Sequence, residues 1–243
     1  MSNELPVRDM AGRRTLLVPS IRRDPAETEM GAEELLSLAT TLRVQVAGHV
    51  PVRIDDPHPA TYVGRGKVET LAIACAEKRI DLVIFESDLS PVQQRNLETA
   101  LGAEVIDRTG LILQIFSAHA RSREGKIQVE LARLRYLLPR LAGRGVLLSR
   151  LGGGLGTRGP GEMQIEVQRR VIRERIHALS MKIEEIEKHR RVIRQGRRKK
   201  WIPTGAVVGY TNAGKTTVLN RLSARGDLRA ANQLFSTLDT ATR

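Results

Sequence analysis

Short apolar runs alternate with helical patterns along the first hundred residues, and this alternation limits the possible fold more than any other feature of the sequence. Four runs are typical of strands, at residues 15–19, 44–54, 81–85 and 103–106. Helical patterns separate them, at residues 24–43, 66–78 and 90–101. Strands separated by helices need crossover connections, which give a mainly parallel sheet with helices on both faces. We therefore expect an α/β subdomain over residues 1–108.

Two of these helices have recognisable start signals. Asp24 and Ser90 are each followed by a proline, and Glu27 and Gln93 stand three residues after them. A capping side chain followed by proline suits the first turn of a helix, where a missing backbone N–H costs nothing. The sequence therefore predicts that helices begin at these two positions.

The pattern changes near Asp107. Over residues 109–141 apolar side chains recur at spacings of three and four, or their sums, which is typical of a helix. A second helical pattern spans residues 162–200, and a glycine-rich stretch at residues 142–161 separates the two. Two long helices joined by one loop predict an antiparallel hairpin, which we assign to residues 109–200.

The predicted hairpin is strongly basic. Residues 121–150 hold eight Lys or Arg against two Glu, and residues 164–200 hold thirteen against five. The whole chain has a formal net charge of +13, and a protein this basic usually meets a polyanion. A solvated helix face normally balances its charges, so the excess predicts contact with RNA phosphates. Aromatic residues make up only 3% of the chain, which argues against stacking on unpaired bases.

A phosphate-binding pattern follows the hairpin: two glycines with four residues between them, then Lys and Thr. Its residues are Gly209, Tyr210, Thr211, Asn212, Ala213, Gly214, Lys215 and Thr216. A predicted strand at residues 206–209 precedes the turn, and a predicted helix at residues 216–223 follows it. Backbone N–H groups at the helix start would bind phosphate oxygens, Lys215 would contact the outer phosphates, and the Thr216 hydroxyl would bind Mg²⁺.

Two other glycine patterns are similar to nucleotide-binding motifs, but their sequence context argues against that function. Gly154, Gly156 and Gly159 imitate a dinucleotide-binding fingerprint, but they follow a basic helix rather than a strand. Residues 64–67 are similar to the end of a phosphate loop, but the first glycine and the final Ser or Thr are missing, so a helix-opening turn explains them better. The five histidines show no metal-ligand spacing, and no residue is assigned a catalytic role.

Six further segments are distinctive: residues 59–67, 89–97, 107–113, 123–131, 136–140 and the glycine-rich loop that ends at 156–162. They resemble segments of the HflX-type ribosome-associated GTPases. The resemblance covers residues 15–243 and implies an α/β subdomain, a two-helix subdomain and a GTPase domain, of which residues 201–243 would be the beginning. It also implies binding of GTP or GDP, binding of the large ribosomal subunit and its rRNA, and the splitting of stalled ribosomes.

The filling of the phosphate-binding pattern resembles that of the translation-factor-related GTPases, and residues 232–239 resemble their first switch segment. Phe235, Ser236, Thr237, Leu238 and Asp239 would lie beside the nucleotide. Thr237 would share the Mg²⁺ ion with Thr216. The sequence departs from the family pattern at Met163, at Gln114 and at the Thr240-Ala241 pair, and the last departure concerns the conformation of the switch.

The sequence ends at Arg243, before the metal-proximal Asp-x-x-Gly and the guanine-reading Asn-Lys-x-Asp of the family. A chain without these segments is expected to bind nucleotide weakly and to lack hydrolysis, although the intact family hydrolyses GTP. The alternative function is an RNA- or ribosome-binding adaptor with a vestigial nucleotide site.

The single cysteine, Cys75, excludes an internal disulfide framework and favours a reducing compartment. The N-terminus lacks a secretory pattern, and no apolar run reaches the roughly 18 residues of a membrane helix. We therefore expect a cytoplasmic monomer without a membrane span.

Overall fold

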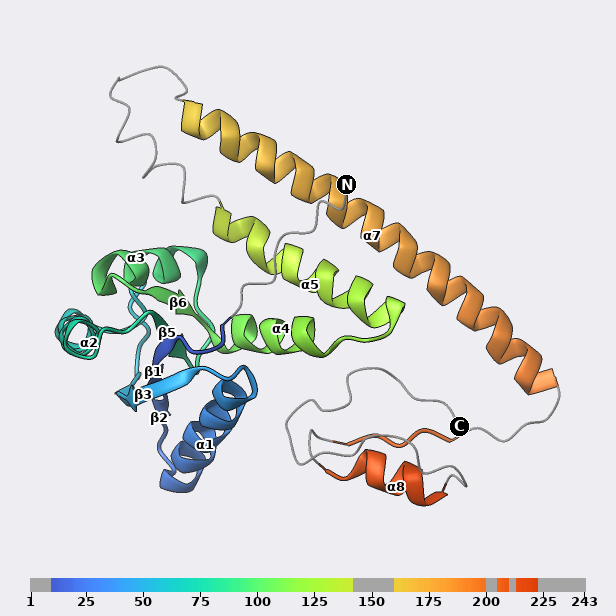
Figure 1. Cartoon of the computed structure of the whole chain (residues 1–243), viewed down its shortest axis with the longest axis horizontal. Helices are drawn as coiled ribbons and strands as arrows, with labels where there is room; N and C mark the ends of the chain where they lie inside the picture. Colours follow the sequence, from blue (N-terminus) through green and yellow to red (C-terminus); the bar gives the residue numbers. More distant parts are fainter. Residues whose placement is uncertain (1–9, 142–159, 200–204, 210–212, 223–243) are drawn as a thin grey trace.

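The computed structural model describes residues 10–141, 160–199, 205–209 and 213–222 (Figure 1). The α/β part contains β1 (Arg14–Val18), β2 (Ser20–Ile21), α1 (Pro25–Thr41), β3 (Gln45–His49), β4 (Val52–Arg53), α2 (Arg65–Glu77), β5 (Leu82–Phe85), α3 (Pro91–Leu101), β6 (Glu104–Ile106) and α4 (Arg108–His119). It is followed by α5 (Arg123–Leu141), α7 (Pro160–Lys199) and α8 (Lys215–Leu222).

Four strands form a parallel sheet in the order β3-β1-β5-β6, and β2 and β4 form a second parallel pair. The predicted α/β class with a mainly parallel sheet is confirmed. From β1 the chain first passes to β3 on one side, and it then crosses over to β5 on the other side. The direction of winding therefore reverses between β1 and β5.

Helices cover both faces of the sheet, as the crossover connections require (Figure 1). On one face Leu71 of α2 is fully buried in a cluster with Leu16. On the other face Leu38 of α1 and Ile115 of α4 are fully buried with Leu17. Leu16 and Leu17 are neighbours on β1, and they point to opposite faces because successive residues of a strand alternate. Burial of this apolar area is the main stabilising contribution to the subdomain.

Both predicted helix starts are confirmed. The Asp24 carboxylate accepts a hydrogen bond from the N–H of Ala26 at 2.9 Å. Ser90 and Gln93 form a reciprocal capping box, in which each side chain accepts a hydrogen bond from the other residue's N–H. These caps satisfy backbone donors that the first turn of a helix leaves unpaired.

One strand and one helix that the sequence pattern predicts as continuous are each divided in two in the structure. In place of one strand at residues 44–54, β3 ends at His49 and the next two-residue strand pairs with β2. In place of one helix at residues 109–141, the chain has an extended backbone at Ala120 between α4 and α5. Residues 120–122 contain neither Gly nor Pro, and the local signal is the Ser122 hydroxyl, which caps α5 by accepting a hydrogen bond from the Gly125 N–H at 2.9 Å. It occurs because α4 covers the sheet while α5 packs on another helix.

The packing of α4 argues against the expected domain boundary at residue 108. This helix packs on α1, β5 and β6 as well as on α5, and its Leu111 belongs to the buried cluster of the sheet. A boundary at residue 108 would separate α4 from the surface that it covers. We therefore propose a boundary near Ala120, so that the helical hairpin consists of α5 and α7.

The hairpin is antiparallel, as predicted (Figure 1). Glu124, near the start of α5, pairs with Arg190 far along α7, whereas Glu130 pairs with the earlier Arg175. The buried apolar seam between the helices contains Leu131, Leu134, Ile172 and Leu179. With 40 residues α7 is about 60 Å long at 1.5 Å per residue, so it extends well beyond the 19-residue α5.

Candidate functional site

The described part of the phosphate-binding segment has the backbone turn that the pattern requires. Gly214 has a φ of +76°, in the left-handed region that glycine adopts without steric cost. α8 begins at the next residue, Lys215, and the N–H of Val218 donates to the Gly214 carbonyl at 3.0 Å. The chain therefore turns sharply into the start of a helix, as phosphate-binding loops do.

Lys215 and Thr216 occupy the first two positions of α8, and both are partly buried. The macrodipole gives the start of a helix a partial positive charge, and Lys215 adds a full one. This arrangement is suited to binding a phosphate group. The other predicted site residues, Tyr210, Thr211, Asn212, Phe235, Ser236, Thr237, Leu238 and Asp239, lie outside the described residues.

The predicted strand at residues 206–209 is wrong for the described structure, since residues 205–209 are exposed and not part of a strand. A strand needs a neighbour to pair its N–H and C=O groups, and the described strands all belong to the N-terminal subdomain. The helix that follows is confirmed, although it begins at Lys215 rather than Thr216.

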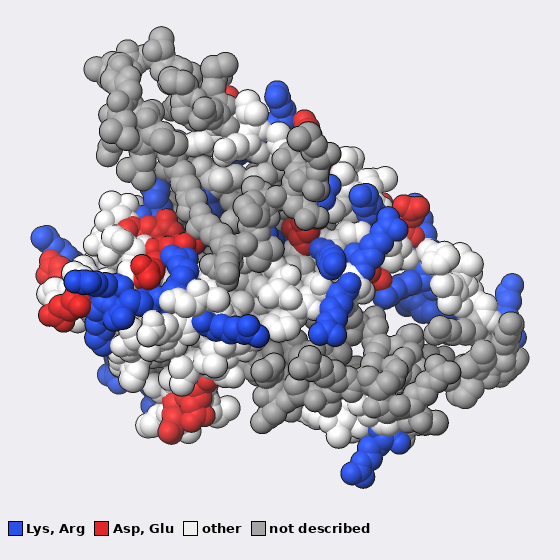
Figure 2. Space-filling model, viewed as in Figure 1, with Lys and Arg blue, Asp and Glu red and all other residues white. Residues whose placement is uncertain are grey.

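The hairpin surface is basic. Exposed Lys and Arg side chains of α7 include Arg170, Arg173, Lys182, Lys188, Arg191 and Arg194. Figure 2 shows basic side chains along the viewed face of the hairpin. The two acidic residues of α5, Glu124 and Glu130, already pair with arginines of α7. α7 also exposes five Glu side chains, but they are fewer than its exposed Lys and Arg, so a positive excess remains that can attract an RNA backbone.

A buried polar cluster, which no sequence pattern predicts, connects α5 to the α/β subdomain. Asp107 is only 1% exposed. It accepts four hydrogen bonds of 2.7–3.1 Å, from the N–H groups of Leu89 and Gly110, the Tyr136 hydroxyl and the Arg140 guanidinium. Arg140 also donates to the Leu89 carbonyl and lies 3.5 Å from the centre of the Tyr136 ring. We call these five residues the Asp107 joint.

The Asp107 joint brings together two segments that are far apart in the sequence. A Cβ atom on Gly110 would lie only 2.6 Å from the Tyr136 hydroxyl oxygen, so glycine makes room for the hydrogen bond to Asp107. Gly110 belongs to segment 107–113 and Tyr136 to segment 136–140. Each segment has a recognisable pattern of its own, but nothing in the sequence indicates that the two segments are in contact.

Alkaline unfolding provides a test of the joint. Burial and the neighbouring Asp107 carboxylate raise the pKa of Tyr136 above its ordinary value. A raised folded-state pKa means that the stabilisation is complete below the unfolded-state pKa of about 10 and decreases as the pH rises above it. We expect Tyr136→Phe to lose less stability than the parent between about pH 9 and about pH 11, measured by urea unfolding. Equal losses in the two proteins would contradict this role of Tyr136.

Two kinds of site are absent from the described part of the chain. No group of three His, Cys, Asp or Glu side chains is arranged there to hold a metal ion. None of its helices combines the length and apolar character needed to cross a bilayer.

Three family models match successive parts of the chain. Residues 29–117 match the GTP-binding GTPase N-terminal region, and residues 119–197 match the GTP-binding GTPase middle region. Residues 204–243 match the 50S ribosome-binding GTPase domain. Over 230 residues the chain is 50% identical to GTPase HflX of Caldanaerobacter subterraneus subsp. tengcongensis, a match that covers 95% of this chain and 53% of that protein.

The chain belongs to the HflX GTPase family.

Another HflX protein, from Escherichia coli, is 43% identical over 233 residues, covering 96% of this chain and 54% of that protein. The GTP-binding protein of Sulfolobus solfataricus, solved in complex with GDP, has a similar structure. Its TM-score is 0.50 at 26% identity, and the match covers 86% of this chain and 53% of that one. The chain therefore spans about half the length of the HflX relatives that it matches. The first two HflX models meet at residue 118, close to the break between α4 and α5.

Proposed function

We propose that this chain is the ribosome-binding part of an HflX GTPase together with the beginning of its nucleotide site. The α5–α7 hairpin would bind rRNA of the large subunit, and residues 209–216 would bind the phosphates of GTP. The protein would act as a cytoplasmic monomer that splits or rescues stalled ribosomes, with GTP hydrolysis resetting it. Family membership and the match to a 50S ribosome-binding GTPase support this proposal.

Mg²⁺ fits the described end of the nucleotide site. The Thr216 side chain follows Lys215 at the start of α8, where a hydroxyl can bind the ion beside a phosphate. Thr237 would provide a second hydroxyl. When bound, the ion would neutralise charge on the outer phosphates, while Lys215 and the N–H groups of the helix start would hold and orient them.

The exposed positive charge of the hairpin is the observation that carries the ribosome proposal. If the hairpin binds phosphates, affinity for the large subunit should fall steeply with salt, because each neutralised phosphate releases counterions. We expect the combined change of Arg170, Arg173 and Arg191 to Gln to reduce the slope of log Kd against log salt by roughly 2 to 3, at about one unit per contact. Subunit binding across a salt series measures this slope.

Three exposed arginines of the α/β subdomain, Arg23, Arg53 and Arg79, form a matched control. Their change to Gln removes the same formal charge from a different surface. A slope reduced equally by both triple variants would show a general charge effect and would contradict a specific role for the hairpin.

The RNA-binding adaptor with a vestigial nucleotide site is a second candidate, which the exposed basic side chains of α7 would serve equally well. Ribosome pelleting of a protein of full HflX length, with GTP, with GDP and without nucleotide, separates the two functions. An HflX GTPase should respond to the nucleotide and release phosphate, whereas an adaptor should bind equally in all three conditions.

A further inference from the structure

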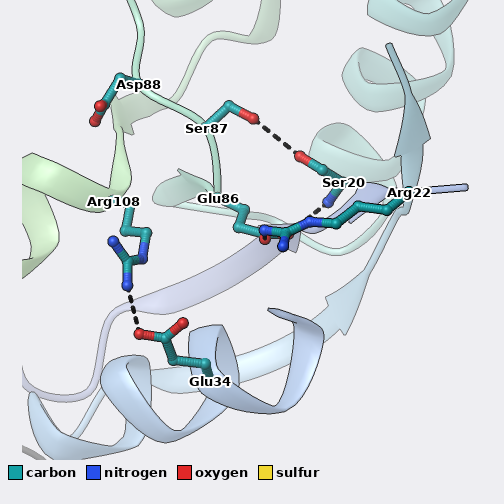
Figure 3. Close-up of a pocket in the computed structure, with 7 residues that line it drawn as sticks. All are labelled: Ser20, Arg22, Glu34, Glu86, Ser87, Asp88 and Arg108. Atoms are coloured by element: carbon teal, nitrogen blue, oxygen red, sulfur yellow. Dashed lines mark hydrogen bonds and ion pairs between the residues drawn. The ribbon is translucent and has the colours of Figure 1, made fainter. Parts of the chain in front are cut away.

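A cavity of about 480 Å³ opens at the carboxyl end of the parallel sheet, away from both the phosphate loop and the hairpin seam. It is lined by Ser20, Arg22, Glu34, Glu86, Ser87, Asp88 and Arg108 (Figure 3). Ligand pockets commonly measure about 300–1,000 Å³, so this cavity has room for a small molecule. Every lining side chain is polar or charged, which favours a hydrophilic ligand.

The topology places this cavity where an open α/β sheet normally binds ligands. Ser20 follows β1, and Glu86 to Asp88 follow β5. The winding of the sheet reverses between these two strands, so the loops that leave them diverge and open a crevice. The cavity is therefore a consequence of the strand order rather than of an irregular surface loop.

Buried contacts hold one wall of the cavity in place. Glu86 is 7% exposed and accepts hydrogen bonds from the Ser20 N–H at 2.7 Å and the Arg22 guanidinium at 2.6 Å. The Ser20 and Ser87 hydroxyls are 2.9 Å apart. A Cβ atom on Gly31 of α1 would lie 2.6 Å from a Glu86 carboxylate oxygen, so glycine leaves room for the carboxylate in this position. The polar wall is thus preorganised before any ligand arrives.

Two guanidinium groups line the cavity, that of Arg22 against the Glu86 carboxylate and that of Arg108 against the Glu34 carboxylate (Figure 3). Among the described residues, Arg22 and Arg108 each use one terminal nitrogen in an ion pair, with Glu86 and Glu34 respectively. Their side chains are 48% and 41% exposed, and each guanidinium has five N–H donors. Both can therefore bind an oxyanion without giving up their ion pairs.

The charges of the lining side chains indicate which class of ligand the cavity can bind. Two arginines face three carboxylates, those of Glu34, Glu86 and Asp88, so the lining is slightly acidic. A polyphosphate would be repelled by such a lining, because its several negative charges would face more carboxylates than guanidinium groups. A molecule with one negative and one positive group would satisfy both kinds of side chain. Glu34 and Asp88 remain exposed enough to accept hydrogen bonds from an ammonium group.

We propose that this cavity binds a small hydrophilic zwitterion, of which a free α-amino acid is the simplest form. Its carboxylate would bind Arg22 and Arg108, and its ammonium group would bind Asp88 or Glu34. The paired hydroxyls of Ser20 and Ser87 would contact the polar remainder of the ligand. This site is separate from the proposed GTP site and does not depend on it.

Titration of the 243-residue chain with L-serine, followed by backbone amide NMR, tests the proposal. Acetate, ethylammonium and inorganic phosphate are the comparison probes, each added up to about 10 mM, which detects millimolar affinity. We expect L-serine to shift the amide signals of Ser20 and Ser87, and acetate or ethylammonium to shift them much less. Equal shifts with phosphate, or no shift with L-serine, would overturn the proposal.

Substitutions identify the groups responsible. Arg108→Gln and Arg22→Gln should each weaken L-serine binding about tenfold, the usual effect of losing a charged hydrogen bond. Arg14→Gln is the control, since Arg14 is exposed at the amino end of β1. An equal loss in the control would overturn the assignment. Arg22 pairs with the buried Glu86, so Arg22→Gln can disturb folding. In that case the effect of Arg108→Gln on L-serine binding tests the assignment.

Discussion

Replacing Lys215 by Ala in a protein of full HflX length should abolish tight GTP binding, with an expected loss of affinity of about 100-fold or more. The lysine is the first residue of α8 and follows a glycine in the left-handed conformation, so its charge is held beside the helix start. Removing one partner from a desolvated charge pair typically costs about 2–5 kcal/mol, and 2.7 kcal/mol is about 100-fold in affinity. Nucleotide titration by calorimetry measures this loss.

Lys182 provides the control for this prediction, because it is an exposed lysine on α7. Lys182→Ala removes the same charge far along the sequence from the phosphate loop and should leave GTP affinity within about twofold. GTP affinity that is unchanged in Lys215→Ala would refute the assignment of residues 209–216 as the nucleotide site.

Much of the α/β subdomain could be predicted from sequence because its signals are local. A short continuous apolar run marks β1, and the caps at Asp24 and Ser90 fix where two helices begin. The glycine before Lys215 is equally local, since the turn into α8 requires a positive φ at that position. Such features depend on neighbours a few residues apart, so a single sequence contains them.

The remaining features depend on contacts that are distant in sequence. The break at Ala120 has no Gly or Pro, and its local signal is a single capping serine, Ser122, within an apolar pattern that continues on both sides. The different surfaces that α4 and α5 cover decide that the chain breaks there. The pairing of β2 with β4 joins two-residue strands that are too short to show alternation. The cavity beside Glu86 depends on strand order, which periodicity alone does not determine.

The Asp107 joint gives the largest expected effect on stability. Arg140→Leu removes the guanidinium that pairs with the Asp107 carboxylate at 2.9 Å, where the two side chains are only 15% and 1% exposed. A buried carboxylate left without its partner costs about 3–5 kcal/mol. We therefore expect the free energy of unfolding to fall by about this amount, measured by urea denaturation.

An exposed ion pair offers the matched comparison. Arg65 pairs with Glu69 on α2, and their side chains are 94% and 63% exposed. Such surface pairs usually contribute less than about 1 kcal/mol, so Arg65→Leu should change stability little. Similar effects of Arg65→Leu and Arg140→Leu would contradict a special role for the buried pair.

A double-mutant cycle separates the charge of Asp107 from the packing of Arg140. Asp107→Asn keeps the size of the side chain but removes its negative charge, so loss of Arg140 no longer leaves a buried charge unpaired. The cost of Arg140→Leu should therefore fall to about 1–2 kcal/mol in the Asp107→Asn background. If the cost is the same in both backgrounds, Arg140 stabilises the protein through packing and its contacts with Leu89 and Tyr136, and the ion pair is not what holds α5 on the subdomain.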